Sequence, residues 1–193
     1  MLSMNVLMGA LELGCIYSLV ALALFLSFRI LNIADMTTDG SFTLGCAVSA
    51  VFAVSGHPVL GMLLAMLAGS AAGYITAALQ TRMGVPSILA GIITNTGLYT
   101  VNLAVMGFSS NVNMLKTETV FTKFRDLVGK GAPYKLLLAF AVTAVVGVLL
   151  VLFLRTRLGL SIRATGDNPD MVRASSINTV STVTIGLCIA NAM

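Results

Sequence analysis

The 193-residue chain is 58% hydrophobic and only 9% charged, with a formal net charge of +4. A soluble globular protein carries roughly 25% charged residues, so this chain cannot cover an ordinary wetted surface, and its mean hydropathy of +0.99 agrees. The basic residues flank apolar runs and form no patch with interleaved aromatics, which argues against a nucleic-acid partner. The composition therefore predicts an all-α, polytopic helical membrane protein whose solvent is the lipid bilayer.

The first apolar run, Val6 to Phe28, has 23 residues and can cross a hydrocarbon core of about 30 Å. No Lys or Arg precedes it, and it exceeds the roughly 7–15 apolar residues of a signal peptide. We therefore expect a retained span. Glu12 interrupts it close enough to one end for its side chain to reach the interface.

A polar stretch, Asn32 to Ser41, precedes a run of only 13 apolar and small residues, Phe42 to Val54. This run is too short for a full crossing, which predicts a short or broken helix beside a cavity enclosed by protein. Asp35 and Asp39 flank the junction. They are candidates for a translocation pathway, or alternatively N-caps or dipole partners of the short helix.

Two further spans follow, Val59 to Leu79 and Ile88 to Val105. In the first, small residues at every fourth position predict a ridge for close helix packing: Ala65, Gly69, Gly73 and Ala77. In the second, polar side chains at i, i+4 and i+7 share one helical face: Asn95, Tyr99 and Asn102. Polar groups inside a bilayer usually face a cavity or a partner, so these three are candidates for a pathway lining; interhelical hydrogen bonding is the alternative.

Leu136 to Leu154 is the fifth predicted span and follows the longest polar stretch, Met106 to Pro133. After a second polar stretch, Arg155 to Asn178, the chain turns apolar again at Thr179. Only about 15 residues then remain, fewer than the roughly 20 that a crossing needs. We therefore expect about six transmembrane segments in a single domain over residues 1–193, with a C-terminal portion of the natural protein missing.

Lys and Arg are slightly more numerous in the loops of one side, which the positive-inside rule places in the cytoplasm. That side collects Arg29, Arg82, Arg155, Arg157, Arg163 and Arg173. The other side collects Lys116, Lys123, Arg125, Lys130 and Lys135. The N-terminus is then expected outside.

A helix-start signal lies in the second polar stretch. We expect residues 166–168 to form a turn, with Asn168 as N-cap and Pro169 at the first helical position. Asp170 complements the dipole in the first turn, and Arg173 follows one turn later.

The predicted helix has about two turns, from Pro169 to Ser176, and should lie on the membrane surface between two spans. One face carries small or apolar side chains suited to docking against another protein: Met171, Val172, Ala174 and Ser175. The alternative is an ordinary amphipathic loop helix.

This segment resembles the cytoplasmic coupling loop of the branched-chain amino acid, ribose and galactoside permease family of ABC importers, with the pattern G-x-x-x-R-A-x-G-x-N-P-x-x-A-x-x-x-G-I. Val172 stands where alanine is frequent, and Ser176 where glycine is usual. Residues 17–35 are similar to the family's N-terminal segment, and residues 35–42 to a subgroup to which aromatic amino acid substrates are ascribed. The residues that match the coupling pattern are Gly159, Arg163, Ala164, Gly166, Asn168, Pro169 and Ile177.

The resemblance implies a permease subunit that imports a small nutrient, amino acid-like or sugar-like, across the inner membrane of a bacterial cell. The implied partners are a second permease copy, cytoplasmic ATPase subunits and an extracytoplasmic substrate-binding protein. ATP hydrolysis would reside in the ATPase subunits, because this sequence has no G-x-x-x-x-G-K-[ST] loop, so neither enzymatic activity nor a cofactor is expected. The residues expected to transmit the ATPase motion are Arg163, Gly166, Asn168, Pro169, Asp170, Arg173 and Ile177.

Three other classes are weighed against this reading. An ion- or proton-coupled secondary transporter would use buried carboxylates, and those available, at positions 12, 35 and 39, are few and near span ends. A channel or scaffold is compatible with the composition. An intramembrane enzyme would need a nucleophile–base set or a metal cluster, but the single histidine, His57, sits in a turn, and H-E-x-x-H and G-x-S-x-G patterns are missing.

The cysteines lack CxxC spacing and are expected to be apolar packing residues: Cys15, Cys46 and Cys188.

Overall fold

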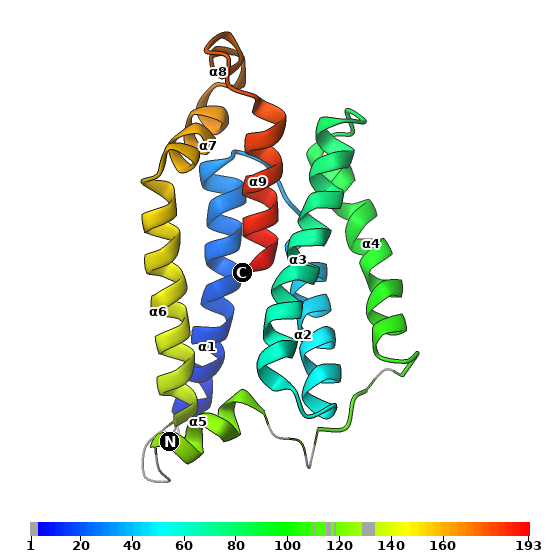
Figure 1. The fold of residues 1–193 in the computed structure, drawn as a ribbon, viewed down its shortest axis with the longest axis vertical. Coiled ribbons are helices and arrows are strands. Elements are labelled where there is room, and N and C mark those ends of the chain that lie inside the picture. Colours follow the sequence, from blue (N-terminus) through cyan, green and yellow to red (C-terminus); the bar gives the residue numbers. More distant parts are fainter. Residues whose placement is uncertain (1–3, 110, 115–116, 118, 129–133) are drawn as a thin grey trace.

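Apolar helices stand side by side in the computed structural model, which describes residues 4–109, 111–114, 117, 119–128 and 134–193 (Figure 1). Helix α1 continues directly into a π-helix, η1, and the other apolar helices are α2, α3, α4, α6 and α9. Their bounds are Met4–Leu24 (α1), Phe25–Ile30 (η1), Thr38–Val54 (α2), Pro58–Thr81 (α3), Ser87–Val105 (α4), Tyr134–Leu154 (α6) and Thr179–Ala192 (α9). The expectation of a polytopic helical membrane protein is confirmed.

In the described part of the chain, four segments are long and apolar enough to cross a membrane: Val6–Ile30, Pro58–Thr81, Ser87–Val105 and Tyr134–Leu154. Helices α2 and α9 are apolar but shorter, with 17 and 14 residues. The predicted short helix is therefore present, but it is unbroken and begins at Thr38 rather than at Phe42. Of the four residues that the helix gains before Phe42, Thr38, Gly40 and Ser41 are buried in the protein, whereas Asp39 is exposed.

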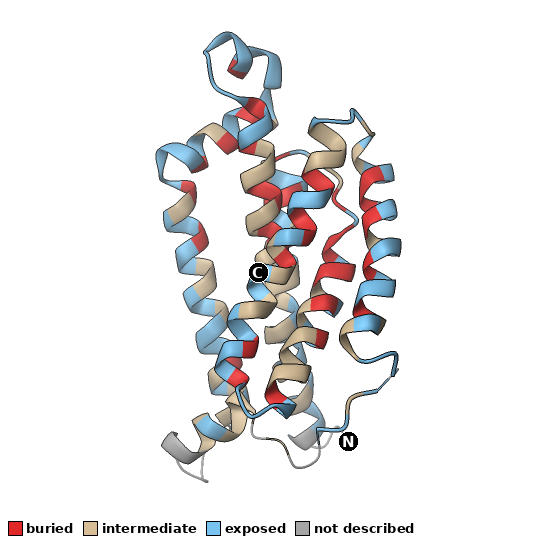
Figure 2. Cartoon of the chain, turned by 45° about the vertical axis from the view of Figure 1, so that its right-hand side comes forward, coloured by how far each residue is buried: buried red, intermediate tan, exposed pale blue. Residues whose placement is uncertain are grey.

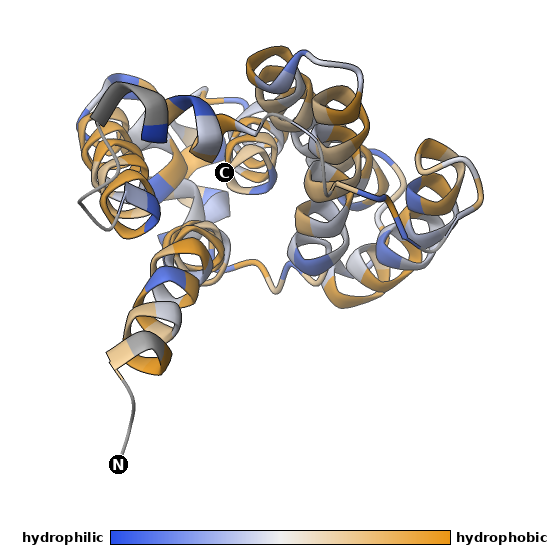
Figure 3. Cartoon of the chain, turned by 90° about the horizontal axis from the view of Figure 1, so that it is seen from below, coloured by the Kyte–Doolittle hydropathy of each residue, from blue (hydrophilic) through white to orange (hydrophobic). Residues whose placement is uncertain are grey.

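The helices form two groups joined by α9. Helices α1 and α6 pair on one side, α2, α3 and α4 pack together on the other, and α9 lies against α3 between the groups (Figure 1). Buried residues concentrate on the facing sides of α2, α3 and α9, whereas α6 is largely exposed (Figure 2). Viewed along the helices, hydrophobic residues also occupy outward-facing sides, as expected where the neighbour is lipid (Figure 3).

The predicted ridge of small residues on α3 makes the contact with α9. A Cβ atom built on Gly69 would collide with the backbone oxygen of Asn191, and one built on Gly73 would collide with that of Leu187. Ala77, the next residue of the ridge, is fully buried. The absence of side chains at the two glycines therefore lets the backbones of α3 and α9 approach closely.

Among the described residues, shorter helices also connect the apolar ones: α5 (Val120–Val128), α7 (Arg157–Asp167) and α8 (Pro169–Ala174). The C-terminal ends of α1 and α3 lie at the same end of the molecule as α7 and α8, whereas the start of α1 and helix α5 lie at the opposite end (Figure 1). The arginines that the sequence assigns to one side therefore belong to elements at one end.

Candidate functional site

The chain leaves helical geometry between η1 and α2, and Leu31, Asp35 and Thr37 of this segment are buried in protein. After η1 the backbone turns at Asn32, which adopts a left-handed conformation with φ 56°. Asn tolerates this conformation better than most residues. Asp35 and Thr37 then lie in the interior, 1% and 0% exposed. A non-helical backbone inside a membrane protein needs protein groups as hydrogen-bond partners, and here the N–H groups of Ile33 and Thr37 donate to the Ser27 oxygen and to the Asp35 carboxylate.

Asp35 is the centre of a buried hydrogen-bond network, the Asp35 network, which contains Asp35, Thr37, Ser41, Thr76 and Asn191. One carboxylate oxygen accepts from the backbone N–H of Thr37 at 2.9 Å, and the other accepts from Nδ2 of Asn191 at 2.7 Å. The side-chain oxygen of Asn191 in turn accepts from Ser41 Oγ at 2.7 Å. The hydroxyl groups of Thr37 and Thr76 lie 2.8 Å apart. The network thus links the non-helical segment with α2, α3 and α9.

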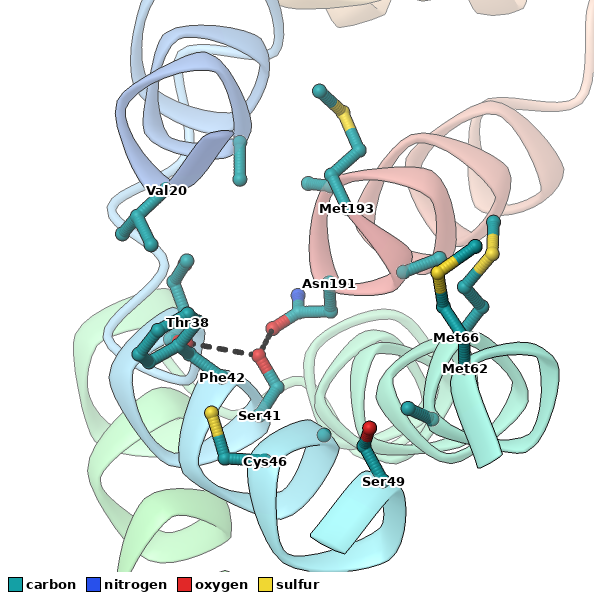
Figure 4. A pocket seen from close by; sticks show the side chains of 15 residues that line it. Val20, Thr38, Ser41, Phe42, Cys46, Ser49, Met62, Met66, Asn191 and Met193 are labelled. Carbon is teal, nitrogen blue, oxygen red and sulfur yellow. Dashed lines mark hydrogen bonds between the residues drawn. The ribbon is translucent and has the colours of Figure 1, made fainter. Parts of the chain in front are cut away.

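A cavity of about 250 Å³ lies next to this network, between α1, α2, α3 and α9. Figure 4 shows Ser41 of α2 and Asn191 of α9 pointing toward one another at its wall. Thr38 contributes a buried hydroxyl oxygen that has no hydrogen-bond partner in the described part of the chain. The lining is Val20, Ala23, Thr38, Ser41, Phe42, Gly45, Cys46, Ser49, Met62, Ala65, Met66, Ala190, Asn191, Ala192 and Met193. Small polar groups among apolar and methionine side chains suit a small amphiphilic molecule better than an ion.

The structure separates the residues that the sequence assigned to a pathway. Asp35 lies beside the cavity without lining it, and Asp39 is exposed in the first turn of α2, where its charge complements the helix dipole. None of Asn95, Tyr99 and Asn102 lines this cavity.

The three α4 residues lie on one side of the helix but differ in their surroundings. Asn102 is buried, Asn95 is half-buried against Gly40 of α2, and Tyr99 is 68% exposed. The buried stripe of α4 is instead Ala90, Thr94, Leu98 and Asn102. Tyr99 follows Leu98 by one residue, about 100° around the helix, and so points outward.

The sequence did not single out the polar lining of the cavity. Ser41, Gly45 and Ser49 recur at every fourth position of α2, and Cys46 follows on the same side. This spacing indicates a polar helical face, but the predicted short helix, Phe42 to Val54, begins after Ser41. Asn191 lies in the last apolar segment, where the sequence has no signal for a polar face.

Helix α8 has the predicted start. The side chain of Asn168 accepts from the backbone N–H groups of Asp170 and Met171, at 3.1 and 3.0 Å, and Pro169 is the first helical residue. Asp170 and Arg173 form an exposed ion pair at 3.8 Å. The N-cap is therefore confirmed, although the helix ends at Ala174 and has six residues.

The expected turn at residues 166–168 is wrong in part, because residues 157–167 form helix α7 and only Asn168 departs from helical geometry. Thr156 caps α7 by accepting from Gly159 N at 3.3 Å. The buried side of α7 has Gly159, Ile162 and Thr165, a helical spacing that the surrounding charges obscure. The two helices α7 and α8 together are called the coupling segment below.

The residues expected to couple to an ATPase are distributed over both sides of the coupling segment. Gly166 packs against the backbone oxygen of Ile30, whereas Arg163 and Ile177 are exposed. On the predicted docking face, Met171 is exposed but Val172 is 5% exposed and faces inward. Met171, Ala174 and Ser175 thus remain available at the surface, and Val172 anchors the helix.

Ser176 has a left-handed backbone with φ 60°, and it occupies the position where the resembled pattern has glycine. Glycine adopts this conformation without steric cost, whereas a side chain costs about 1–2 kcal/mol. A glycine after α8 would meet this backbone conformation without strain, whereas this chain has a strained serine there.

Metal binding has no geometric support among the described residues, since no group of three or more His, Cys, Asp and Glu side chains converges there. Cys15, Cys46 and Cys188 are free thiols. Cys46 lies at the cavity, and the other two are half-buried on α1 and α9.

Known proteins resemble the chain along nearly its whole length. A family described as "Branched-chain amino acid transport system / permease component" matches residues 6–192. The "Tyrosine transport system permease protein" of Clostridioides difficile (strain R20291) is 33% identical over 191 residues, which cover 98% of this chain and 62% of that protein.

An uncharacterized protein of Rickettsia prowazekii (strain Madrid E) is 34% identical over 171 residues, 88% of this chain and 58% of that protein. The chain thus spans less than two thirds of the length of either curated relative. No solved structure matches it significantly.

Proposed function

Because the chain belongs to the family of permease components of branched-chain amino acid transport systems, we propose that it forms the membrane-spanning part of an importer driven by separate ATPase subunits. The observation that carries the proposal is the family match over residues 6–192, which includes both the apolar helices and the coupling segment. The proposed partners are two cytoplasmic ATPase subunits, an extracytoplasmic substrate-binding protein and a second permease. The proposed location is the inner membrane of a bacterial cell, with the coupling segment in the cytoplasm.

The coupling segment has a form suited to receiving motion from an ATPase. Its outer helix, α8, is fixed at its start by the Asn168 cap and anchored by the buried Val172. Two of its charged residues, Arg163 and Arg173, are exposed on the outside. A rigid, well-anchored helix can pass an applied displacement to the helices behind it, whereas a frayed loop would absorb it.

For the substrate we propose an aromatic amino acid. The relative from Clostridioides difficile is named a tyrosine transport permease, and residues 35–42 resemble the aromatic subgroup. The cavity beside the Asp35 network provides hydroxyl and amide groups together with methionine and phenylalanine side chains. This combination can bind a molecule that has both an apolar ring and polar groups.

Uptake into proteoliposomes tests the proposal. The permease assembled with its ATPase subunits should transport tyrosine when ATP and the binding protein are present, and the charge reversal Arg173→Glu should leave ATP hydrolysis but abolish most uptake. Because Arg173 Nε donates to Thr179 Oγ1 at 3.1 Å, Thr179→Val is the matched control that removes this bond without reversing a charge. Uptake that persists without ATP would instead favour a secondary transporter, in which the buried carboxylate of Asp35 would be the first residue to examine.

Reactivity of the native cysteines tests the location of the passage. In single-cysteine variants, Cys46 at the cavity should react faster with a charged, membrane-impermeant thiol reagent than Cys15, which is half-buried and does not line the cavity. Added substrate should protect Cys46. Equal labelling of both cysteines, or labelling unaffected by substrate, would place the passage elsewhere.

A further inference from the structure

The non-helical residues 31–37 touch the coupling segment at one end. Gly166 of α7 packs directly on the backbone of Ile30 and Leu31, so closely that any side chain at Gly166 would collide with them. Helix α9 also packs closely on Leu31, because a Cβ atom built on Gly186 would lie 2.7 Å from Leu31 Cδ1. A displacement of α7 toward α1 therefore pushes on Ile30 and Leu31.

The end of α1 is built so that it can yield to such a displacement. Residues 25–30 form a π-helix, and the backbone N–H groups of Leu31 and Ile33 donate to the oxygens of Leu26 and Ser27, both at 3.0 Å. Wide helical turns of this kind interrupt the regular hydrogen-bond pattern and occur frequently at functional sites. The left-handed Asn32 then reverses the chain toward Asp35.

At its other end, the same segment is attached to the wall of the cavity through Asp35. The carboxylate accepts from Asn191, and Asn191 accepts from Ser41; both of these partners line the cavity, whereas Asp35 does not. All three side chains are buried, with exposures of 1%, 6% and 3%. Hydrogen bonds in such a dry environment are strong and directional, so the three residues should move as one unit.

We propose that Asp35 is a positioning residue that carries movement of the coupling segment to the cavity. The route runs from Gly166 to the backbone of Ile30 and Leu31, along residues 32–37, and through Asp35 to Asn191 and Ser41. Motion of α7 then changes the separation of α2 and α9 at the cavity wall. The inference rests on the proposed function, because it assumes that an ATPase moves the coupling segment.

The test measures substrate imported per ATP hydrolysed by the permease assembled with its ATPase subunits. Asp35→Leu keeps a similar volume and removes both acceptors, so ATP hydrolysis should continue while import per ATP falls about fivefold or more, the usual size of a coupling effect. Asn191→Leu should act in the same direction.

Exchanging the side chains at positions 35 and 191 tests whether the hydrogen bond between them matters, rather than either residue by itself. In the double variant Asp35→Asn, Asn191→Asp, an amide at position 35 can donate to a carboxylate at position 191 and still accept from Thr37 N, and Ser41 can still donate to position 191. Import per ATP should recover most of its original value. This variant also keeps the proposal testable if Asp35→Leu does not fold.

Thr76→Val is the matched control, because it removes the buried contact with Thr37, at 2.8 Å, but leaves every bond between Asp35 and the cavity. It should lower the Tm without changing import per ATP. An unchanged ratio in Asp35→Leu, or a double variant as uncoupled as the single ones, would overturn the positioning role. If the unaltered permease shows no ATP-dependent import, the proposed function itself fails, and the inference falls with it.

Discussion

The α1–α6 pair and the α2–α3–α9 region are both built from apolar helices, yet they are held together differently. Helix α6 buries few residues, among them Ala139, Leu150 and Leu154, and presents long aliphatic side chains outward. In the α2–α3–α9 region, glycines allow backbone contact and the Asp35 network joins the helices. Since lipid is as apolar as leucine, apolar side chains alone give helices little reason to associate, and close packing and hydrogen bonds supply it. The region that holds the polar groups is thus also the most tightly packed one.

The largest expected effect comes from filling the α3–α9 contact. Gly73→Leu would place a side chain against the backbone oxygen of Leu187, which cannot move aside as a flexible side chain would. The destabilisation should exceed the about 1–3 kcal/mol of ordinary overpacking and should prevent recovery of a monodisperse protein in detergent.

Gly147→Leu in α6 is the matched control, because the nearest atom to a Cβ built there is Leu22 Cδ1, at 3.9 Å. Its thermal unfolding should resemble that of the unaltered protein. If both variants behaved alike, the two regions would not differ in packing as described.

A smaller effect is expected from removing a buried hydrogen bond in each region. Asn191→Leu leaves an oxygen of Asp35 and the Ser41 hydroxyl without that partner, and unsatisfied buried groups cost about 1–3 kcal/mol. Thr143→Val removes the bond from Thr143 Oγ1 to the Cys15 oxygen, at 2.9 Å, between α6 and α1. A single interhelical bond of this kind contributes about 0.6 kcal/mol. Thermal unfolding in detergent should show a larger loss of stability in Asn191→Leu than in Thr143→Val. The reverse order would contradict the described difference between the two regions.

The smallest effect is expected where backbone strain alone changes. Ser176→Gly relieves the left-handed serine after α8 and should raise stability by about 1 kcal/mol, seen as a higher Tm. Ser175→Gly is the control, because Ser175 has an ordinary φ of −84° and its hydroxyl donates to the Met171 oxygen at 3.1 Å. A gain at Ser175 equal to that at Ser176 would mean that the left-handed conformation is not the source.

Much of the fold could be predicted because the bilayer restricts the choices. The apolar segments, the small-residue ridge of α3 and the Asn168 cap each follow from a local rule that a sequence displays directly. Helix α7 was missed for a local reason as well. Its buried residues, Gly159, Ile162 and Thr165, are few and stand among charges, so the segment looks like a loop.

Less of the candidate site than of the fold could be predicted from the sequence. The polar face of α4 is regular in the sequence, but whether a face meets a cavity, another helix or lipid depends on the neighbours, and Tyr99 faces outward. Asp35 could be recognised as a carboxylate at the edge of a span. Its partner Asn191 lies 156 residues away, and no local pattern connects the two.

The sequence by itself determined that this is a helical membrane protein with a capped surface helix, because hydropathy, span length and capping are properties of consecutive residues. The tertiary structure decided which polar residues share an interior. It brought Asp35 beside Asn191 and placed Gly166 on the end of α1. Those contacts join residues far apart in the chain, and only the packing of whole helices sets the distances between them.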